Sequence, residues 1–287
     1  MSRPLARALA LALALAAADA RAHHVPGHGA SEGVRNINSL GSRGGRAESR
    51  LLLLNEFVYT SQGVNPSVTD TTSLYGEFAP IPALSLAVQA PFLVLRDLAN
   101  EETRVGYGDT RLQLRVTPHA RKLIHRVFTA GLTVSLPTRT VRLNVDPGPV
   151  TAVSPYVFFT RTYDRHFWQV MGLSVLERRR AGSAVDLSVG AQGGSRLLGG
   201  KFTLGLGALL DLRVLNTCAQ PTGGAAVCAH SRPGEDDRPI GALRAIVLTT
   251  FSYHLTKRLT LLGAIQGPIS PRLDFTVAGS LGAQVFF

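Results

Sequence analysis

The chain has 287 residues, and its formal net charge is +11. Hydrophobic residues make up 45% of it, and the mean hydropathy of +0.14 is high for a glycine-rich soluble protein. The length fits one domain. The positive charge would suggest a nucleic-acid partner, but the sequence has no basic helix and no basic patch interleaved with aromatic residues. We therefore expect no binding to nucleic acid.

Residues 1–22 have the three parts of a secretory signal peptide. Arg3 and Arg7 supply the positive start, residues 9–18 contain only Leu and Ala, and Ala20-Arg21-Ala22 is a small-residue cleavage site. The apolar run is shorter than the roughly 20 residues that span a bilayer. We predict a cleaved signal peptide; the alternative is an N-terminal anchor helix.

The following segment, residues 23–48, is rich in Gly, Ser and Arg and has few large apolar residues. This composition is typical of a flexible tail, here a periplasmic one. Three histidines at its start, His23, His24 and His28, could hold copper, nickel or zinc. The alternative is a tail without a metal, and our prediction is that no metal binds.

The rest of the chain, residues 49–287, has no second long apolar run and alternates apolar with polar or small residues. Such alternation is typical of β-strands, and a sheet can span a bilayer only when it closes on itself. We predict about twelve strands joined by alternately short and longer connections, at residues 49–60, 70–81, 84–95, 105–117, 125–137, 151–162, 165–177, 183–194, 201–214, 241–254, 258–267 and 273–287. The competing architecture is a large soluble β-protein.

The end of the chain supports a membrane barrel. Residues 279–287 alternate up to a terminal Phe287, which we predict to be the membrane-insertion signal for the barrel-assembly machinery. An even number of strands would place both termini in the periplasm. The predicted fold is therefore an all-β transmembrane antiparallel β-barrel in the outer membrane of a Gram-negative-type bacterium.

Alternation also assigns the two faces of each strand. In the segment 105–117, charged and amide side chains point to one side and leucines and a valine to the other. An Arg or Lys that faces lipid at mid-bilayer costs about 2–4 kcal/mol, so the charged side must face the barrel interior. The same argument gives the predicted lumen and selectivity residues, which are Glu56, Glu77, Asp109, Arg111, Gln113, Arg115, Asp186, Asp211, Arg213, Arg244 and Asp274.

Two interpretations of these interior charges stay open. They could pair with one another and fill the barrel, or they could line a passage that selects by charge. The position of Asp109 beside Arg111 and Arg115 favours an ion pair over a selective constriction. Small residues in the same wall, such as Gly131 and Ser188, favour a usable passage.

Three stretches resemble a known family. Val105-Gly106-Tyr107-Gly108-Asp109 looks like the "G-x-G-D" strand of the outer-membrane transporters associated with the meta-pathway of phenol degradation. Residues 129–138 resemble that family's segment ending in "P-T-G", with Arg139 in place of the usual Gly, and Tyr75–Phe78 also fits. The resemblance implies a barrel that admits small, aromatic or hydrophobic molecules, without identifying one solute.

The only two cysteines, Cys218 and Cys228, lie in the longest predicted loop, residues 215–240. An exported chain meets an oxidising environment, so we expect a disulfide. It would close a loop of about 11 residues and stabilise the fold by roughly 3 kcal/mol in the chain-entropy model. Two cysteines are too few for a structural zinc site.

Two sets of residues suggest contacts with the membrane. Arginines in predicted external loops could bind lipopolysaccharide phosphates, or they could simply be solvated; they are Arg96, Arg104, Arg139, Arg142 and residues 178–180. Aromatic residues suited to interfacial girdles are Tyr59, Tyr156, Trp168 and Tyr253.

An outer-membrane enzyme would need a nucleophile and a base within hydrogen-bond reach at the outer leaflet. The histidines of the predicted barrel instead fall at the predicted periplasmic ends: His119, His125, His166 and His254. We expect no enzyme and no cofactor. The predicted function is a channel or transporter that passes small, aromatic or hydrophobic solutes by passive diffusion. The alternatives are a structural or adhesive barrel without an open pore and, less favoured, a lipid-modifying enzyme.

Overall fold

The structure is a computed structural model of the chain. The residues that it describes are 47–60, 67–98, 101–118, 125–140, 151–179, 182–218, 240–241, 243–269 and 277–287. Among them, no helix is long and apolar enough to cross a membrane. The predicted signal peptide, almost all of the predicted tail, Cys228 and Asp274 lie outside the described residues.

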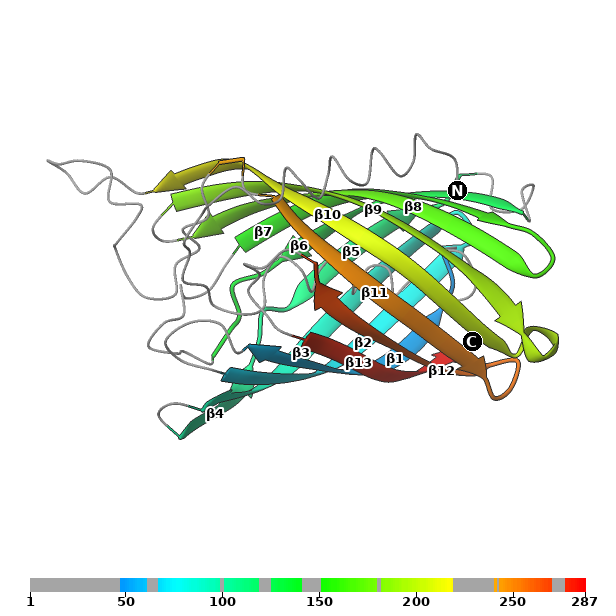
Figure 1. Ribbon diagram of the computed structural model, residues 1–287, viewed down its shortest axis with the longest axis horizontal. Helices are drawn as coiled ribbons and strands as arrows, with labels where there is room; N and C mark the ends of the chain where they lie inside the picture. The colour runs from blue at the N-terminus through cyan, green and yellow to red at the C-terminus, as the bar shows by residue number, and fades with distance from the viewer. Residues whose placement is uncertain are drawn as a thin grey trace, which may run out of the picture.

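A single antiparallel sheet wraps into a barrel of tilted strands (Figure 1). Its strands are β1 (Arg50–Thr60), β2 (Ser67–Ile81), β3 (Leu84–Asp97), β4 (Glu102–Tyr107), β5 (Arg111–Val116), β6 (Arg126–Ser135), β7 (Thr151–Thr162), β8 (His166–Arg179), β9 (Gly182–Leu197), β10 (Phe202–Cys218), β11 (Leu243–His254), β12 (Leu259–Pro268) and β13 (Val277–Phe286). A short 3-10 turn, η1 (Leu198–Gly200), joins β9 to β10. The sheet closes because β1 pairs with both β2 and β13, and β2 also pairs with β3.

Two of the strands share one position in the barrel. β5 pairs with Leu84–Gln89 of β3, and β4 pairs with Phe92–Asp97 of the same strand. The closed barrel therefore has twelve strand positions, which confirms the predicted fold. Closure gives each of β1, β2 and β3 a partner on both sides, as a barrel in lipid requires, whereas among the described strands β4 pairs only with β3.

The prediction of one continuous strand at residues 105–117 is wrong, because the chain bulges at residues 108–110 and separates β4 from β5. In β3, only Ala90 and Pro91 lie opposite these three residues. Pro91 has no N–H to donate, and its carbonyl accepts a hydrogen bond from the Gly108 N–H at 2.9 Å. One extra residue on one strand is the definition of a β-bulge, and the proline explains why the regular ladder stops here.

The bulge changes which residues face inward. Before it, Val105 and Tyr107 are exposed on the outside, at 57% and 64%. After it, Leu112 and Leu114 are exposed and Arg115 is buried. A shift of one residue moves every later side chain to the opposite face. The bulge thus lets β4 and β5 both present apolar side chains outward although their alternation is out of phase.

The two faces of β10 show the pattern that holds around the barrel. Leu204, Leu206 and Leu210 are exposed, whereas Asp211 and Arg213 are buried. Because a strand alternates its side chains between two faces, the apolar residues form the outer surface and the charged residues line the inside. The predicted assignment of faces along this strand is confirmed.

The two ends of the barrel differ in their connections. Arg50 of β1 pairs with Phe286 of β13, so the first strand begins and the last strand ends at the same rim of the barrel. Short connections meet at this end, such as residues 82–83 and residues 163–165. We call it the short-turn end and the opposite one the long-loop end. The β8–β9 connection lies at the long-loop end yet consists only of residues 180–181, shorter than predicted, because both strands extend further.

The position of Cys218 differs from the expectation. It is the last residue of β10 and pairs with Gly182 of β9, so it does not lie in the loop. The predicted strand ended at residue 214, but β10 continues past a register shift between Arg213 and Leu215. The disulfide to Cys228 stays a prediction, since Cys228 lies outside the described residues.

Candidate functional site in the barrel interior

Most of the predicted interior residues are buried within the barrel. Those that the structure describes as buried are Glu56, Glu77, Asp109, Gln113, Arg115, Asp186, Asp211, Arg213 and Arg244, while Arg111 is half-buried. The wall of the barrel is one sheet thick, so a buried side chain in it points toward the interior. Their role in selectivity stays a prediction.

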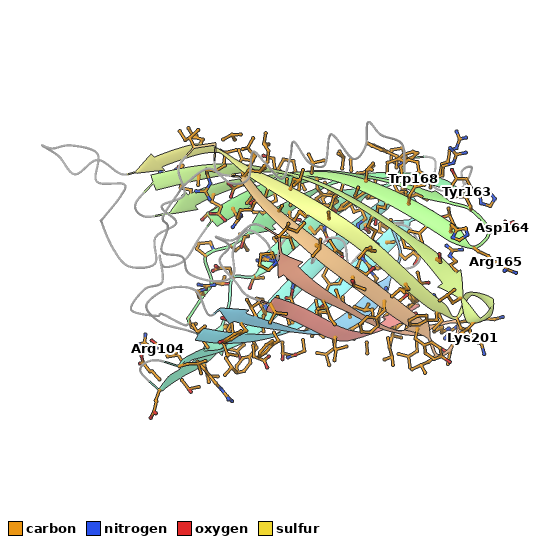
Figure 2. The ribbon with its side chains drawn as sticks, in the orientation of Figure 1. Arg104, Tyr163, Asp164, Arg165, Trp168 and Lys201 are labelled. Carbon is orange, nitrogen blue, oxygen red and sulfur yellow. The ribbon has the colours of Figure 1, made fainter. Side chains whose placement is uncertain are left out.

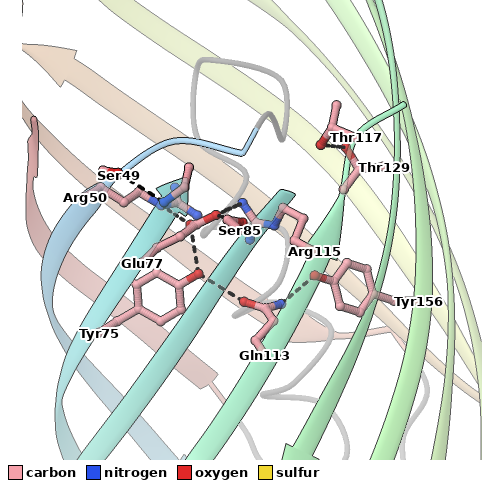
Figure 3. Close-up of polar contacts among 11 residues, drawn as sticks. Ser49, Arg50, Tyr75, Glu77, Ser85, Gln113, Arg115, Thr117, Thr129 and Tyr156 are labelled. Atoms are coloured by element: carbon pink, nitrogen blue, oxygen red, sulfur yellow. Dashed lines mark hydrogen bonds and ion pairs between the residues drawn. The ribbon is translucent and has the colours of Figure 1, made fainter. Parts of the chain in front are cut away.

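Glu77 forms the centre of a polar cluster toward the short-turn end (Figure 3). Its cross-strand neighbour Arg50 donates a hydrogen bond from Nε to Oε2 at 2.6 Å. Arg115 lies on the other side, with Nη1 3.2 Å from Oε1. The Ser85 hydroxyl donates to the same Oε1 at 2.5 Å, and the Tyr75 hydroxyl donates to Oε2 at 2.9 Å.

A chain of side chains extends this cluster across the barrel wall. The Tyr75 hydroxyl lies 3.0 Å from Gln113 Oε1, and Gln113 Nε2 donates to the Tyr156 hydroxyl at 2.7 Å. The contacts therefore run from β1 through β2, β3 and β5 to β7 (Figure 3). We call the seven residues the Glu77 network; they are Arg50, Tyr75, Glu77, Ser85, Gln113, Arg115 and Tyr156.

Gly131 of β6 makes room for Tyr156 in the Glu77 network. It pairs with Tyr156 on one side and with Arg115 on the other. A Cβ at this position would overlap the Tyr156 ring, so only glycine allows the ring to cross β6 and reach Gln113. Close approach of this kind is one of the few reasons to place glycine inside a strand.

A second cluster of charges lies toward the long-loop end, on β9, β10 and β11. Arg213 donates two hydrogen bonds to its cross-strand partner Asp186, at 2.5 and 3.0 Å. Arg244 donates from Nε to its partner Asp211 at 2.8 Å. The Ser188 hydroxyl donates to the other oxygen of Asp211 at 2.7 Å. All these residues are buried, so the pairs are shielded from solvent.

Asp109 has a contact that the sequence did not predict. We expected it to pair with Arg111 and Arg115, but Arg115 contacts Glu77. Asp109 accepts a hydrogen bond from the Arg139 N–H at 3.1 Å, and the Arg139 guanidinium lies 3.8 Å away. The neighbouring Thr138 hydroxyl donates to the Gly108 carbonyl at 3.2 Å. The two main stretches of the family resemblance thus pack against each other at the bulge.

Sequence reasoning missed Arg50, Tyr75 and Tyr156 as interior residues. Tyr75 has the same strand parity as Glu77, so its orientation could have been read from the alternation. Arg50 precedes four leucines, where no alternation is visible. The prediction that Tyr156 belongs to an aromatic girdle is wrong, since the residue is 3% exposed and lies inside the barrel.

The interior also contains an apolar region next to the Glu77 network. Buried apolar side chains of β7, β8, β10, β11 and β13 form one cluster: Ala152, Tyr156, Phe158, Met171, Leu173, Val175, Leu209, Ile246, Leu248 and Ala278. Tyr156 belongs to both groups, and its ring meets that of Phe158 edge-on at 5.2 Å. The barrel interior therefore offers charged and aromatic surfaces side by side.

The outer surface of the barrel is apolar with aromatic residues toward its ends (Figure 2). Trp168 packs on Phe159 at 5.2 Å near the short-turn end, and Tyr253 is exposed at the same end. Phe92 and Tyr107 meet at 5.9 Å toward the long-loop end. Exposed apolar surface of this extent marks an interaction with lipid or another partner, and the end positions suit interfacial aromatics.

The histidines within the described chain do not form a metal site. Across the described ranges, no group of three or more His, Cys, Asp or Glu residues could hold a metal ion. His166 Nδ1 lies 2.9 Å from the Ser195 hydroxyl, and His254 Nδ1 lies 2.7 Å from the Thr260 hydroxyl. Both contacts lie at the short-turn end, where β8, β10 and β12 begin.

Comparison with solved structures finds a similar barrel fold in outer-membrane channels. The COG4313 outer membrane channel from Pseudomonas putida F1 aligns with a TM-score of 0.64 at 12% identity, over 84% of this chain and 96% of that one. The NanC porin aligns with a TM-score of 0.50 at 9% identity, over 83% and 99%. The chain has the fold of an outer-membrane barrel. No family model and no curated protein matches its sequence.

Proposed function

We propose that the protein is an outer-membrane channel through which small organic molecules, aromatic and hydrophobic ones included, diffuse passively. The observation that carries this proposal is the closed twelve-stranded barrel with an apolar outside and a mixed charged and aromatic inside. The shared fold with the COG4313 channel, over nearly all of that chain, supports it. The protein needs no cofactor and no energy source of its own for this activity.

The proposed placement in the membrane follows from the outer surface. Large apolar side chains exposed all around a barrel are stable in lipid and costly in water. The N-terminal 22 residues would direct export, residues 23–48 would form a flexible periplasmic segment, and residues 49–287 would form the barrel. The short-turn end would then face the periplasm, with Phe287 as the insertion signal, since short periplasmic turns are the rule in such barrels.

Lipid headgroups are the proposed partners of the two rims. Arg104 at the long-loop end pairs with Glu102 at 2.7 Å, and its side chain is 25% exposed. Arg96 and Arg178 at the same end are exposed. Arginine donors of this kind suit lipopolysaccharide phosphates. Figure 2 shows Arg165 and Lys201 at the opposite rim, where Tyr163 also lies.

The second candidate function is a structural barrel without an open pore. The observation that favours it is the depth at which the interior side chains are buried: Arg213 and Arg115 are 0% and 1% exposed. Side chains that are packed this tightly fill the cross-section of the barrel at their height along its axis. An enzymatic function has less support, since the His166–Ser195 contact lies at the short-turn end, away from the proposed outer leaflet.

Conductance tests the proposal directly. Refolded mature protein would be inserted in a planar bilayer and its single-channel current recorded, with and without added benzoate and phenol. We expect a steady conductance that these solutes modulate. If protein that is shown to be folded gives no conductance, the channel proposal is wrong and the packed structural barrel is favoured.

A further inference from the structure

The Glu77 network has more positive than negative charge. The guanidinium groups of Arg50 and Arg115 both contact the Glu77 carboxylate, at 2.6 and 3.2 Å. Two positive charges and one negative charge leave a formal charge of +1, because the other four members of the network are neutral. Within this network, one arginine therefore has no carboxylate of its own.

Both arginines have hydrogen-bond donors that remain unused. Arg50 Nη2, Arg115 Nε and Arg115 Nη2 are buried and make no hydrogen bond in the described structure. The residues themselves are 5% and 1% exposed. Buried polar groups almost always have a partner, and a guanidinium has five N–H donors in a planar fork. Unused donors on two neighbouring guanidinium groups point to an acceptor that the described residues do not supply.

The second charge cluster does not have this surplus. Arg213 is paired with Asp186, and Arg244 is paired with Asp211, so each arginine has its own carboxylate. This second cluster is therefore balanced in formal charge. The surplus belongs to the Glu77 network, and it lies next to the apolar cluster through their shared residue, Tyr156.

We propose that Arg50 and Arg115 bind the carboxylate of a small aromatic acid, whose ring lies against Tyr156 and Phe158. Arginine donors match a carboxylate in geometry and charge, and binding sites for organic molecules combine apolar walls with a few such polar groups. The inference rests on the proposed function, because the channel brings the solute to the network. It narrows the proposed solutes from small organic molecules to aromatic anions.

Calorimetry on the folded mature protein in detergent micelles tests this site. The probes are benzoate, phenol, which has the ring but no carboxylate, and inorganic phosphate, which has charge but no ring. We expect benzoate to bind more tightly than either of the other two. Equal binding of phenol would overturn the role of the carboxylate, and equal binding of phosphate would overturn the role of the aromatic wall.

Two substitutions with opposite effects on charge separate binding from folding. Arg115→Gln reduces the formal charge of the network to zero and should weaken benzoate binding about tenfold, as expected for the loss of charge-assisted hydrogen bonds. Glu77→Gln raises that charge to +2 and should strengthen it. Arg104→Gln, the same change at the distant long-loop rim, should leave it unaltered. If Arg115→Gln fails to fold, Arg50→Gln makes the same change of charge and provides the same test.

The outcomes distinguish this inference from the proposed function. Benzoate affinity that does not change in folded Arg115→Gln or Arg50→Gln protein would overturn the site. Conductance without benzoate binding would also overturn it and leave the channel standing. Binding that depends on Arg115, in protein that does not conduct, would support the site and overturn the channel.

Discussion

At the scale of single residues, the interior of the barrel depends on direct cross-strand partners. Arg213 and Asp186 face each other on β10 and β9, and Asp211 and Arg244 face each other on β10 and β11. Such neighbours have Cβ atoms about 4.5–5.5 Å apart, so two opposite charges at these positions are already close enough to form an ion pair. Because the pairs are buried, removing one member leaves the other as an uncompensated buried charge, which lowers the stability of the fold.

The Arg213–Asp186 pair gives a prediction about stability. Arg213→Met removes the two guanidinium contacts of a buried carboxylate and should lower the free energy of unfolding by about 3–5 kcal/mol. The double variant Arg213→Met/Asp186→Leu should recover most of the loss, because no buried charge remains. Urea unfolding in lipid vesicles, followed by fluorescence of the single tryptophan, Trp168, measures both. A double variant no more stable than the single one would contradict this prediction.

Gly131 gives a second prediction at this scale. Gly131→Ala places a Cβ against the Tyr156 ring and 2.6 Å from the Leu114 carbonyl oxygen. We expect it to break the Tyr156–Gln113 hydrogen bond and to cost about 1–3 kcal/mol, as overpacking usually does. The matched control is Gly76→Ala on the outer face, where the nearest atom is 4.0 Å from the added Cβ. Equal stability of the two variants would show that Tyr156 can move aside.

At the scale of elements, the bulge between β4 and β5 keeps the outside of the barrel apolar. Exposure alternates over residues 103–107 and over residues 111–116, yet the inward parity changes between Tyr107 and Arg111. The backbone of the bulge is held from the other side: the Thr138 hydroxyl accepts from the Thr110 N–H at 2.7 Å, and the Leu136 N–H donates to the Thr110 carbonyl at 2.8 Å. The bulge is therefore a built feature of the sheet.

Deleting one residue of the bulge tests its role. Deletion of Thr110 would restore a simple register with β3, but it would turn either the apolar side of β4 or that of β5 inward. We expect no folded barrel, as judged by the loss of the heat-dependent shift in gel mobility that folded membrane barrels show. Thr110→Ala keeps the residue count and should fold. A deletion variant that still folds would mean that the bulge can form from the remaining residues.

At the scale of the whole molecule, alternation predicted the fold and the faces but not the contacts. Charged residues on β5 and β10 could be assigned to the interior because a charged side chain that faces lipid is costly. The partners could not be assigned, because they depend on register between strands far apart in sequence; Arg115 and Glu77 are separated by 38 residues. The inward position of Arg50 could not be predicted either, because the four leucines after it show no alternation of apolar and polar residues. The bulge opposite Pro91 was missed as well, because one proline does not reveal a change of register in the strand that it faces.

The apolar exterior leads to a prediction for the entire barrel. Leu206 lies in the middle of the outward row of β10 and is 66% exposed. In a bilayer, Leu206→Arg should lower the free energy of unfolding by about 2–4 kcal/mol, because the charge would face lipid near mid-membrane. The control Leu255→Arg lies in the short turn after β11, where the same charge should cost about 0–1 kcal/mol. Urea titration of both variants in phospholipid vesicles measures the difference.

A barrel that stays in water would tolerate arginine equally at the two exposed positions. Equal stabilities of the two variants would therefore overturn the proposed membrane placement. A larger loss of stability for Leu206→Arg would support a lipid-facing β10.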